Sequence, residues 1–222
     1  MTFDFAPFVL SGRVYGSLLN HRTALVAVES VAHKPPYNGL PRAPVLFIKP
    51  RNTLSVSGSP IEVPAGLQEL EVAAMLGLVI GITACRVSEA RAHEYIAGYT
   101  LVNDVSVPQP NYYRPSVRYK ARDGFCPMGP RVAARDSIGV PDALTLRTFI
   151  DGSLAQEASM SQLVRPIARL LADVTEFMTL APGDVLAVAA AAPAPRIRAG
   201  QTVSIEGDGL GTLANPVVAG SE

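Results

Sequence analysis

The sequence is poor in the residue types that cross-link a chain or bind metals through sulfur. Cys85 and Cys126 are the two cysteines among 222 residues, and the sequence has three histidines and no tryptophan. The two cysteines form no CxxC pair and no cluster with histidine, so neither a disulfide framework nor a thiolate metal site is indicated. Such sparse cysteine is typical of a cytoplasmic protein.

Charge is also scarce, and neither sign is in excess. Charged residues make up 17% of the chain, with 19 basic and 19 acidic residues and no basic block. This composition argues against a nucleic acid as a main partner, because phosphate binding needs a cluster of lysine and arginine. Zero net charge also leaves little repulsion between copies, which favours self-association.

Long hydrophobic runs are absent as well, although the composition is apolar. The longest run without charge, 72–85, is shorter than the stretch needed to cross a bilayer of about 30 Å as a helix. Residues 1–10 lack the basic start of a secretory signal, so we expect no membrane association. A hydrophobic content of 48% excludes intrinsic disorder, and the length suits one large domain. We expect a loose N-terminal arm over residues 1–11 and a single domain over residues 12–222.

Local patterns predict a strand-rich mixed α/β fold without regular βα alternation. The expected strands are 12–19, 45–49, 72–82, 99–105, 144–150, 185–188, 202–206 and 213–218. The expected helices are 21–32, 88–97 with Gly98 as its C-terminal glycine, and one that starts near 161 and runs to 178. Asp151-Gly152 indicates a hairpin, whereas 51–64 and 119–130 have the composition of turns and loops.

A few polar residues are placed where chemistry is possible. Asp104 ends an apolar strand, where a carboxylate either coordinates a ligand or caps a turn. Glu69 and Glu71 project from the same face of an extended chain, so they either meet one cation or are solvated. Lys120 and Asp123 belong to a charged, glycine-containing segment that forms either an anion site or an ion-paired surface loop.

Several stretches, distributed from about residue 12 to 218, together resemble the fumarylacetoacetate hydrolase family. They are LNHR (19–22), FIKPRNT (47–53), VIG (79–81), YIAGYTLVNDVS (95–106), YYRP (112–115), KARDGFCPMGP (120–130) and EFMTLAPGD (176–184). The resemblance implies a mixed β-roll with a few peripheral helices. It also implies chemistry on 2-oxo acids, in which a bound Mg²⁺ or Mn²⁺ withdraws electrons from the substrate.

Within that family the stretches are most similar to the isomerase/decarboxylase branch of bacterial 4-hydroxyphenylacetate catabolism. This similarity implies decarboxylation of 5-carboxymethyl-2-oxo-hex-3-ene-1,7-dioate and isomerisation of 2-hydroxyhepta-2,4-diene-1,7-dioate, both small dicarboxylic 2-oxo acids or their enols. The resemblance assigns Asp104 to the metal, and Lys120, Asp123 and Lys49 to substrate binding.

Other parts of the family pattern are missing. A Glu-x-Glu pair of metal ligands precedes the apolar-Ile-Gly motif in the family, and Ala73 and Met75 stand at those places here. The lid histidine and glutamate fall near Ala24 and Ala27, so no catalytic acid or base is assigned. The family's Gly-Thr-Pro loop corresponds to three alanines at 189–191. The arginine that the family has shortly after Asp104 is absent, because residues 107–109 are valine, proline and glutamine.

These gaps lead to three expectations. The first is a subunit of the isomerase/decarboxylase that works with a metal-competent sister chain of the same fold, with or without self-association. The second is a complete enzyme in which Asp104, Glu69 and Glu71 bind Mg²⁺ and Lys120 binds the substrate. The third is a non-catalytic binding or scaffold protein that recognises a dicarboxylate or a partner.

Overall fold

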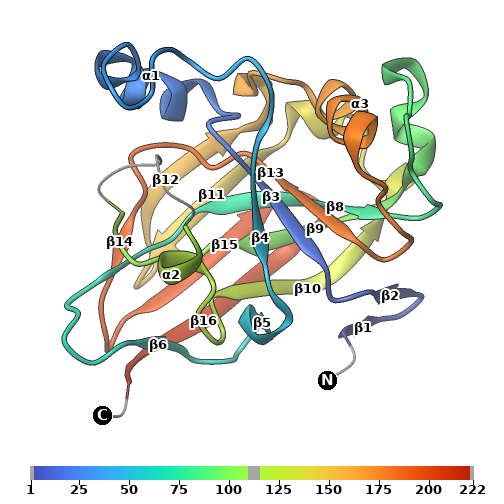
Figure 1. Cartoon of the computed structure of the whole chain (residues 1–222). Coiled ribbons are helices and arrows are strands. Elements are labelled where there is room, and N and C mark those ends of the chain that lie inside the picture. The colour runs from blue at the N-terminus through green and yellow to red at the C-terminus, as the bar shows by residue number, and fades with distance from the viewer. Residues whose placement is uncertain (1–2, 110–115, 221–222) are drawn as a thin grey trace.

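Two curled sheets form the body of the chain in the computed structural model, which describes residues 3–109 and 116–220 (Figure 1). The larger sheet has seven strands in the spatial order β4-β3-β13-β8-β9-β10-β5. Their bounds are Val45–Lys49 (β4), Val14–Leu18 (β3), Val185–Val188 (β13), Ala74–Ile80 (β8), Ile96–Asn103 (β9), Cys126–Ala134 (β10) and Leu54–Val56 (β5).

The smaller sheet has five strands in the order β12-β11-β15-β16-β6. They are Ser153–Ser159 (β12), Thr145–Ile150 (β11), Thr202–Gly207 (β15), Gly211–Ala219 (β16) and Ile61–Val63 (β6). A short pair joins β7 (Leu70–Glu71) to β14 (Arg196–Ile197), and β1 (Phe3–Phe5) pairs with β2 (Phe8–Leu10). The fold is therefore strand-rich and mixed α/β, as predicted.

The helices are few and lie outside the sheets. They are α1 (Arg22–Ala32), α2 (Val117–Lys120) and α3 (Ile167–Phe177), with 3-10 turns at Arg51–Thr53, Glu89–Tyr95, Arg135–Ser137, Pro141–Ala143 and Met160–Gln162. Both α1 and α3 lie along the upper edge of the sheets in Figure 1. Within the described ranges no helix combines the length and the apolar character that a bilayer crossing requires.

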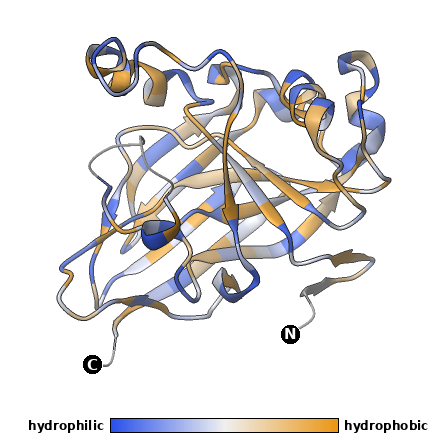
Figure 2. Cartoon of the chain, in the orientation of Figure 1, coloured by the Kyte–Doolittle hydropathy of each residue, from blue (hydrophilic) through white to orange (hydrophobic). Residues whose placement is uncertain are grey.

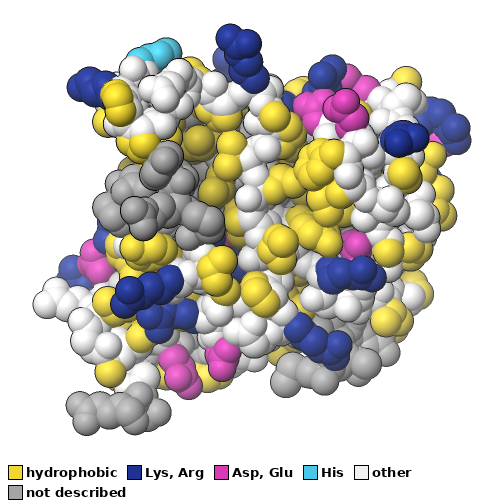
Figure 3. Space-filling model, viewed as in Figure 1, with side chains coloured by type: hydrophobic (Ala, Val, Ile, Leu, Met, Phe, Trp, Pro, Cys, Tyr) yellow, Lys and Arg dark blue, Asp and Glu magenta, His cyan; other side chains and the backbone are white. Residues whose placement is uncertain are grey.

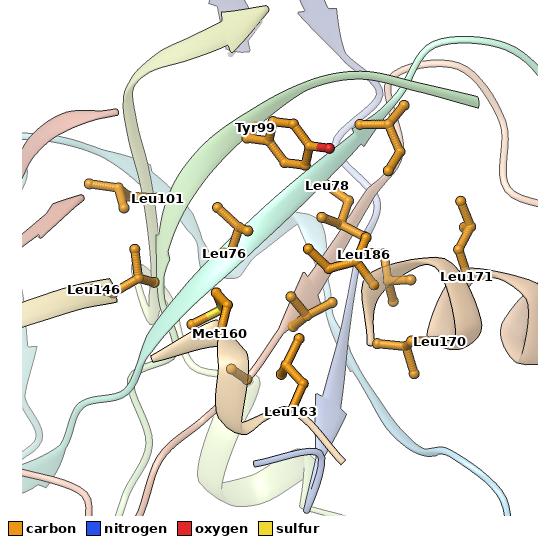
Figure 4. Close-up of a cluster of buried hydrophobic side chains, with 14 of the residues drawn as sticks. Leu76, Leu78, Tyr99, Leu101, Leu146, Met160, Leu163, Leu170, Leu171 and Leu186 are labelled. Carbon is orange, nitrogen blue, oxygen red and sulfur yellow. The ribbon is translucent and has the colours of Figure 1, made fainter. Parts of the chain in front are cut away.

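The central strand β8 is buried on both faces, which explains its continuous apolar sequence. Leu76 and Leu78 face the cluster that contains Leu170 and Leu171 of α3, whereas Met75 faces a second cluster on the other side. Figure 4 shows the leucines of β8 and α3 converging, and Figure 2 shows hydrophobic residues concentrated on the central strands. Each such side chain contributes about 1.5–3 kcal/mol by leaving water.

Elements with a strong local pattern are confirmed. The strands β4 and β13 have the predicted bounds, and α1 begins one residue after its N-cap His21. The hairpin of β11 and β12 turns at Asp151-Gly152, as predicted. The helix α3 begins at Ile167, later than predicted, because Pro166 is its N-cap.

Other predictions were wrong where tertiary contacts override the local pattern. The predicted helix over 88–97 is a 3-10 turn that ends at Tyr95, and Gly98 is a strand residue. A Cβ at Gly98 would lie 2.3 Å from the Ala133 carbonyl oxygen, so glycine is needed for the close approach of β10. The turn-rich stretch 51–64 contains β5 and β6, and the predicted loop 119–130 ends in β10.

The first residues of the described chain are also more ordered than predicted. Instead of a loose arm, β1 and β2 form an antiparallel hairpin. Phe5 and Phe8 from this hairpin pack against the second cluster, next to Leu10, which is buried. Apolar burial against the larger sheet therefore fixes the arm. The division into an arm over residues 1–11 and one domain over residues 12–222 stays a prediction.

Candidate functional site

The candidate site lies where β9 ends and β8 begins. Asp104 directly follows β9 and is paired through its backbone with Ala73, which precedes β8: the Ala73 N–H donates to the Asp104 carbonyl at 3.2 Å, and the Asp104 N–H donates back at 3.0 Å. One step further along the ladder, Glu71 and Ser106 are paired in the same way. The antiparallel register therefore places the side chains of Asp104, Ala73 and Glu71 around one region.

The Asp104 carboxylate holds two lysine ammonium groups. Lys49 Nζ lies 2.8 Å from Oδ1, and Lys120 Nζ lies 2.5 Å from Oδ2. The side chains of Asp104 and Lys49 are 2% and 1% exposed, so this carboxylate and this ammonium are removed from water. In this arrangement Asp104 forms ion pairs with two buried cations, and its assignment as a metal ligand stays a prediction.

Lys49 reaches this position because of the alternation along β4. Phe47 and Lys49 share one face of the strand, and both are buried. The Lys49 ammonium also donates to the carbonyl oxygens of Val105 at 2.8 Å, Phe125 at 2.8 Å and Lys120 at 3.1 Å. It therefore ties β4 to the segments that follow β9 and α2.

Burial and the neighbouring charges shift the pKa values of Asp104 and Lys49. Burial would raise the pKa of Asp104, but the charges of Lys120 and Lys49 outweigh that effect and hold the pKa below its usual value. Burial lowers the pKa of Lys49, and the negative charge of Asp104 opposes this shift. Lys120 Nζ also lies 4.7 Å from the centroid of the Phe47 ring, a favourable position for a cation.

A cavity of about 440 Å³ opens in front of Asp104 and Lys120. Small apolar side chains form much of its wall: Ala24 from α1, Ala73, and Ala190, Ala191, Ala192, Pro193 and Ala194 from the segment after β13. The polar side chains that line it are Glu71, Asp104, Ser106, Gln109, Lys120 and Arg196. The site is thus a cavity with an alanine-rich wall and several charged groups.

The two glutamates of the sequence analysis are held by arginines. Arg196 contacts Glu69 at 2.6 Å and Glu71 at 3.0 Å, and Arg198 contacts Glu69 at 3.0 Å. Glu71 lines the cavity, whereas Glu69 is not part of its lining. Burial raises the pKa of Glu71, opposed by the charges of Arg196 and Lys120.

The residues of this region do not fit a divalent cation. Within residues 3–109 and 116–220, no group of three or more His, Cys, Asp or Glu side chains lies close enough to hold a metal ion. Lysines occupy both oxygens of Asp104, Arg196 holds Glu71, and Ala73 presents a methyl group. Mg²⁺ and Mn²⁺ need several oxygen ligands at about 2 Å, and ammonium groups supply none.

The first turn of α1 closes one side of the cavity. His21, buried as the N-cap, accepts the Thr23 N–H through Nδ1, and Thr23 Oγ1 accepts the Ala192 N–H at 2.8 Å. This contact joins α1 to the alanine-rich segment. Ala24 presents only a methyl group to the cavity, so the helix contributes no acid or base there.

The structure brings some of the predicted site residues together and separates others. Lys120 and Asp104 meet in the cavity wall, and Lys49 lies behind Asp104. Asp123 is exposed, accepts a hydrogen bond from Asn52 Nδ2 at 2.6 Å and is outside the cavity lining. The substrate-binding roles of Lys120, Asp123 and Lys49 stay predictions, and the YYRP motif at 112–115 lies outside the described residues.

Sequence reasoning missed one cavity residue with functional chemistry. Arg196 lines the cavity next to Glu71, although it lies more than a hundred positions away along the chain and in no recognised motif. The signal was weak: Arg196 and Arg198 are two positions apart, which matches the spacing of Glu69 and Glu71 in another segment. Only the pairing of β14 with β7 makes that match visible.

Comparisons with known proteins agree with this architecture. The sequence profile described as "Fumarylacetoacetate (FAA) hydrolase C-terminal" matches residues 13–218. A 4-hydroxyphenylacetate degradation bifunctional isomerase/decarboxylase from Salmonella dublin is 42% identical over 213 residues, which cover 96% of this chain and 48% of that protein. The chain therefore spans about half the length of the curated relative it matches.

Solved structures show the same fold. A 5-carboxymethyl-2-hydroxymuconate delta-isomerase from Mycobacterium smegmatis has a TM-score of 0.82 and 34% identity, covering 96% of this chain and 81% of that one. A maleylpyruvate hydrolase from Sphingobium, solved with manganese(II) and pyruvate, has a TM-score of 0.77 and 25% identity, covering 94% of this chain and 71% of that one.

Proposed function

The chain belongs to the fumarylacetoacetate hydrolase family, and on this basis we propose that it is a subunit of a 4-hydroxyphenylacetate-pathway isomerase/decarboxylase. In this proposal a sister chain of the same fold carries the catalytic metal site. The present chain contributes its fold, an interface and contacts to the dicarboxylic substrate. The substrates are 5-carboxymethyl-2-oxo-hex-3-ene-1,7-dioate for decarboxylation and 2-hydroxyhepta-2,4-diene-1,7-dioate for isomerisation.

One observation carries the proposal: both oxygens of Asp104 are held by lysine ammonium groups, opposite an alanine. Loss of CO₂ from a conjugated oxo acid leaves an electron pair that needs an electron sink, which a metal ion supplies in this family. Among the described residues, no group of three or more His, Cys, Asp or Glu side chains lies close enough to hold such an ion, which supports a metal site on another chain. The coverage of about half of a bifunctional relative supports a second, complementary half.

The reconstituted complex tests the proposal. The chain is mixed with a sister chain that carries Glu-x-Glu before the apolar-Ile-Gly motif, and native mass spectrometry follows association. Loss of the ultraviolet absorbance of the conjugated substrate follows activity. We expect a stable hetero-oligomer whose activity neither chain shows alone. Two chains that do not associate would contradict the proposal and favour a separate binding or scaffold role.

A second candidate function is a complete enzyme, favoured by the position of Glu71 and Asp104 in the same cavity. Calorimetric titration of the isolated chain with Mn²⁺ separates the two candidates. The subunit proposal expects no binding tighter than millimolar, because ammonium and guanidinium groups occupy the carboxylates. Micromolar binding that disappears in Asp104→Ala would instead support the complete enzyme.

A further inference from the structure

We propose that the cavity is a metal-independent binding site for a small dicarboxylate, with Lys120 holding one carboxylate of the ligand and Arg196 the other. The proposal deepens the proposed function, because it names the two residues that would hold the dicarboxylate and makes that binding independent of a metal. Only the identity of the natural ligand rests on the proposed function. The existence of the binding site is argued from the residues that line the cavity.

The first anchor is the ammonium group of Lys120. It lines the cavity, its residue is 6% exposed, and the Phe47 ring and Asp104 fix its position. An ammonium has three N–H donors, of which Asp104 Oδ2 accepts one. Since Lys49 and Lys120 together face a single carboxylate, the cluster carries a net positive charge that favours an incoming anion.

The second anchor is the guanidinium of Arg196. Its side chain is 45% exposed and lines the cavity, with Nη1 directed to Glu69 and Nη2 to Glu71. A guanidinium has five N–H donors, so two ion pairs leave donors for a ligand carboxylate. Burial raises the pKa of Glu71, and the charges of Arg196 and Lys120 oppose this shift.

Much of the remaining cavity wall is made of small apolar side chains. Ala73 and the alanines of 190–194 form a wall without charge, and the volume of about 440 Å³ is within the range of small-molecule sites. A glutamate at the position of Ala73 would repel an anion, whereas a methyl group can contact a short hydrocarbon chain. A cavity that combines two cationic groups with an apolar wall matches a ligand with a carboxylate at each end.

Calorimetric titration of the full chain in EDTA tests this site. Glutarate is the dicarboxylate probe, and pentanoate is the matched probe with a single carboxylate. We expect glutarate to bind with an affinity that EDTA leaves unchanged, and pentanoate to bind about tenfold more weakly, because one charge-assisted contact is lost. Undetectable glutarate binding, equal affinities for the two probes, or a requirement for Mg²⁺ would overturn the proposal.

Two arginine variants localise the second anchor. Arg196→Gln should weaken glutarate binding about tenfold and leave pentanoate binding unchanged. Arg198→Gln is the matched control, because Arg198 also contacts Glu69 but is outside the cavity lining. The glutarate affinity of this variant should stay within about twofold of wild type. Equal losses in the two variants would exclude a specific role for Arg196.

A third variant avoids disturbing the buried charges around Lys120. Ala73→Gln fills the cavity without adding charge, so it should abolish glutarate binding while the urea unfolding curve shows a folded protein. Wild-type affinity in this variant would place the ligand elsewhere. Activity of the complex with the sister chain is measured separately, so loss of glutarate binding and failure of the subunit proposal are distinguishable.

Discussion

Replacement of Lys49 by methionine tests whether the buried ion cluster stabilises the fold. The change removes an ammonium that contacts Asp104 Oδ1 and the carbonyl oxygens of Val105, Phe125 and Lys120. Removing one partner of a buried ion pair costs about 3–5 kcal/mol. Lys120 still neutralises Asp104, which reduces the cost, but the three carbonyl oxygens lose a charged donor, which increases it.

We therefore expect Lys49→Met to lower the free energy of unfolding by about 3–5 kcal/mol, a large part of the about 5–15 kcal/mol typical of a domain. Urea unfolding followed by circular dichroism measures the change. Arg91→Met is the matched control, because Arg91 contacts Glu94 at the same 2.8 Å but on the surface, and it should cost less than about 1 kcal/mol.

The double variant Lys49→Met with Asp104→Asn sharpens the test. Asparagine removes the charge that Lys49 neutralises, so the two changes together should cost at least about 1 kcal/mol less than the sum of the single variants. Strict additivity, or a Lys49→Met protein within about 1 kcal/mol of wild type, would refute a stabilising role for the cluster.

Three further results are expected. Gly16→Ala should destabilise the fold by about 1–3 kcal/mol in urea unfolding, because its Cβ would lie 2.1 Å from the Phe47 ring that supports Lys120. The pKa of Asp104 is lowered in the folded state, so the ionised carboxylate stabilises the fold fully above its unfolded pKa of about 3.8. This stabilisation is lost as the pH falls through the folded pKa. Acid unfolding should therefore lower the stability of the wild type more steeply than that of Asp104→Asn. EDTA should leave the melting temperature of the isolated chain unchanged in calorimetry, and a fall of several degrees would indicate a resident cation.

The fold was predictable where one segment contains its own signal. β4 is a short run of β-forming residues between two prolines, and α3 repeats apolar residues at helical spacing, so local patterns predicted both. The 3-10 turn at Glu89–Tyr95 was predicted as a helix, because neighbouring strands, not its own propensity, decide where it ends. The strand β10 was missed because its Pro127 and Pro130 have the composition of a loop.

The candidate site was also predictable only where a single segment contains its own motif. The family motifs marked Asp104 and Lys120, but no local pattern indicated that both lysines share the Asp104 carboxylate. The resemblance assigned Lys49 to substrate binding, and only the structure shows that it is buried against Asp104. Arg196 entered the cavity unpredicted, through the pairing of β14 with β7.

The sequence by itself determined the strand-rich class, the main elements and the family, because spacing and motif order are properties of the chain alone. The tertiary structure decided which charges meet. Lys49 lies 56 positions before Val105 in the chain, whereas Asp104 directly precedes Val105. The two side chains nevertheless share one buried cluster, because strand register brings them together. Electrostatic energy depends on distance in space and on exclusion of water, and neither quantity is written in residue order.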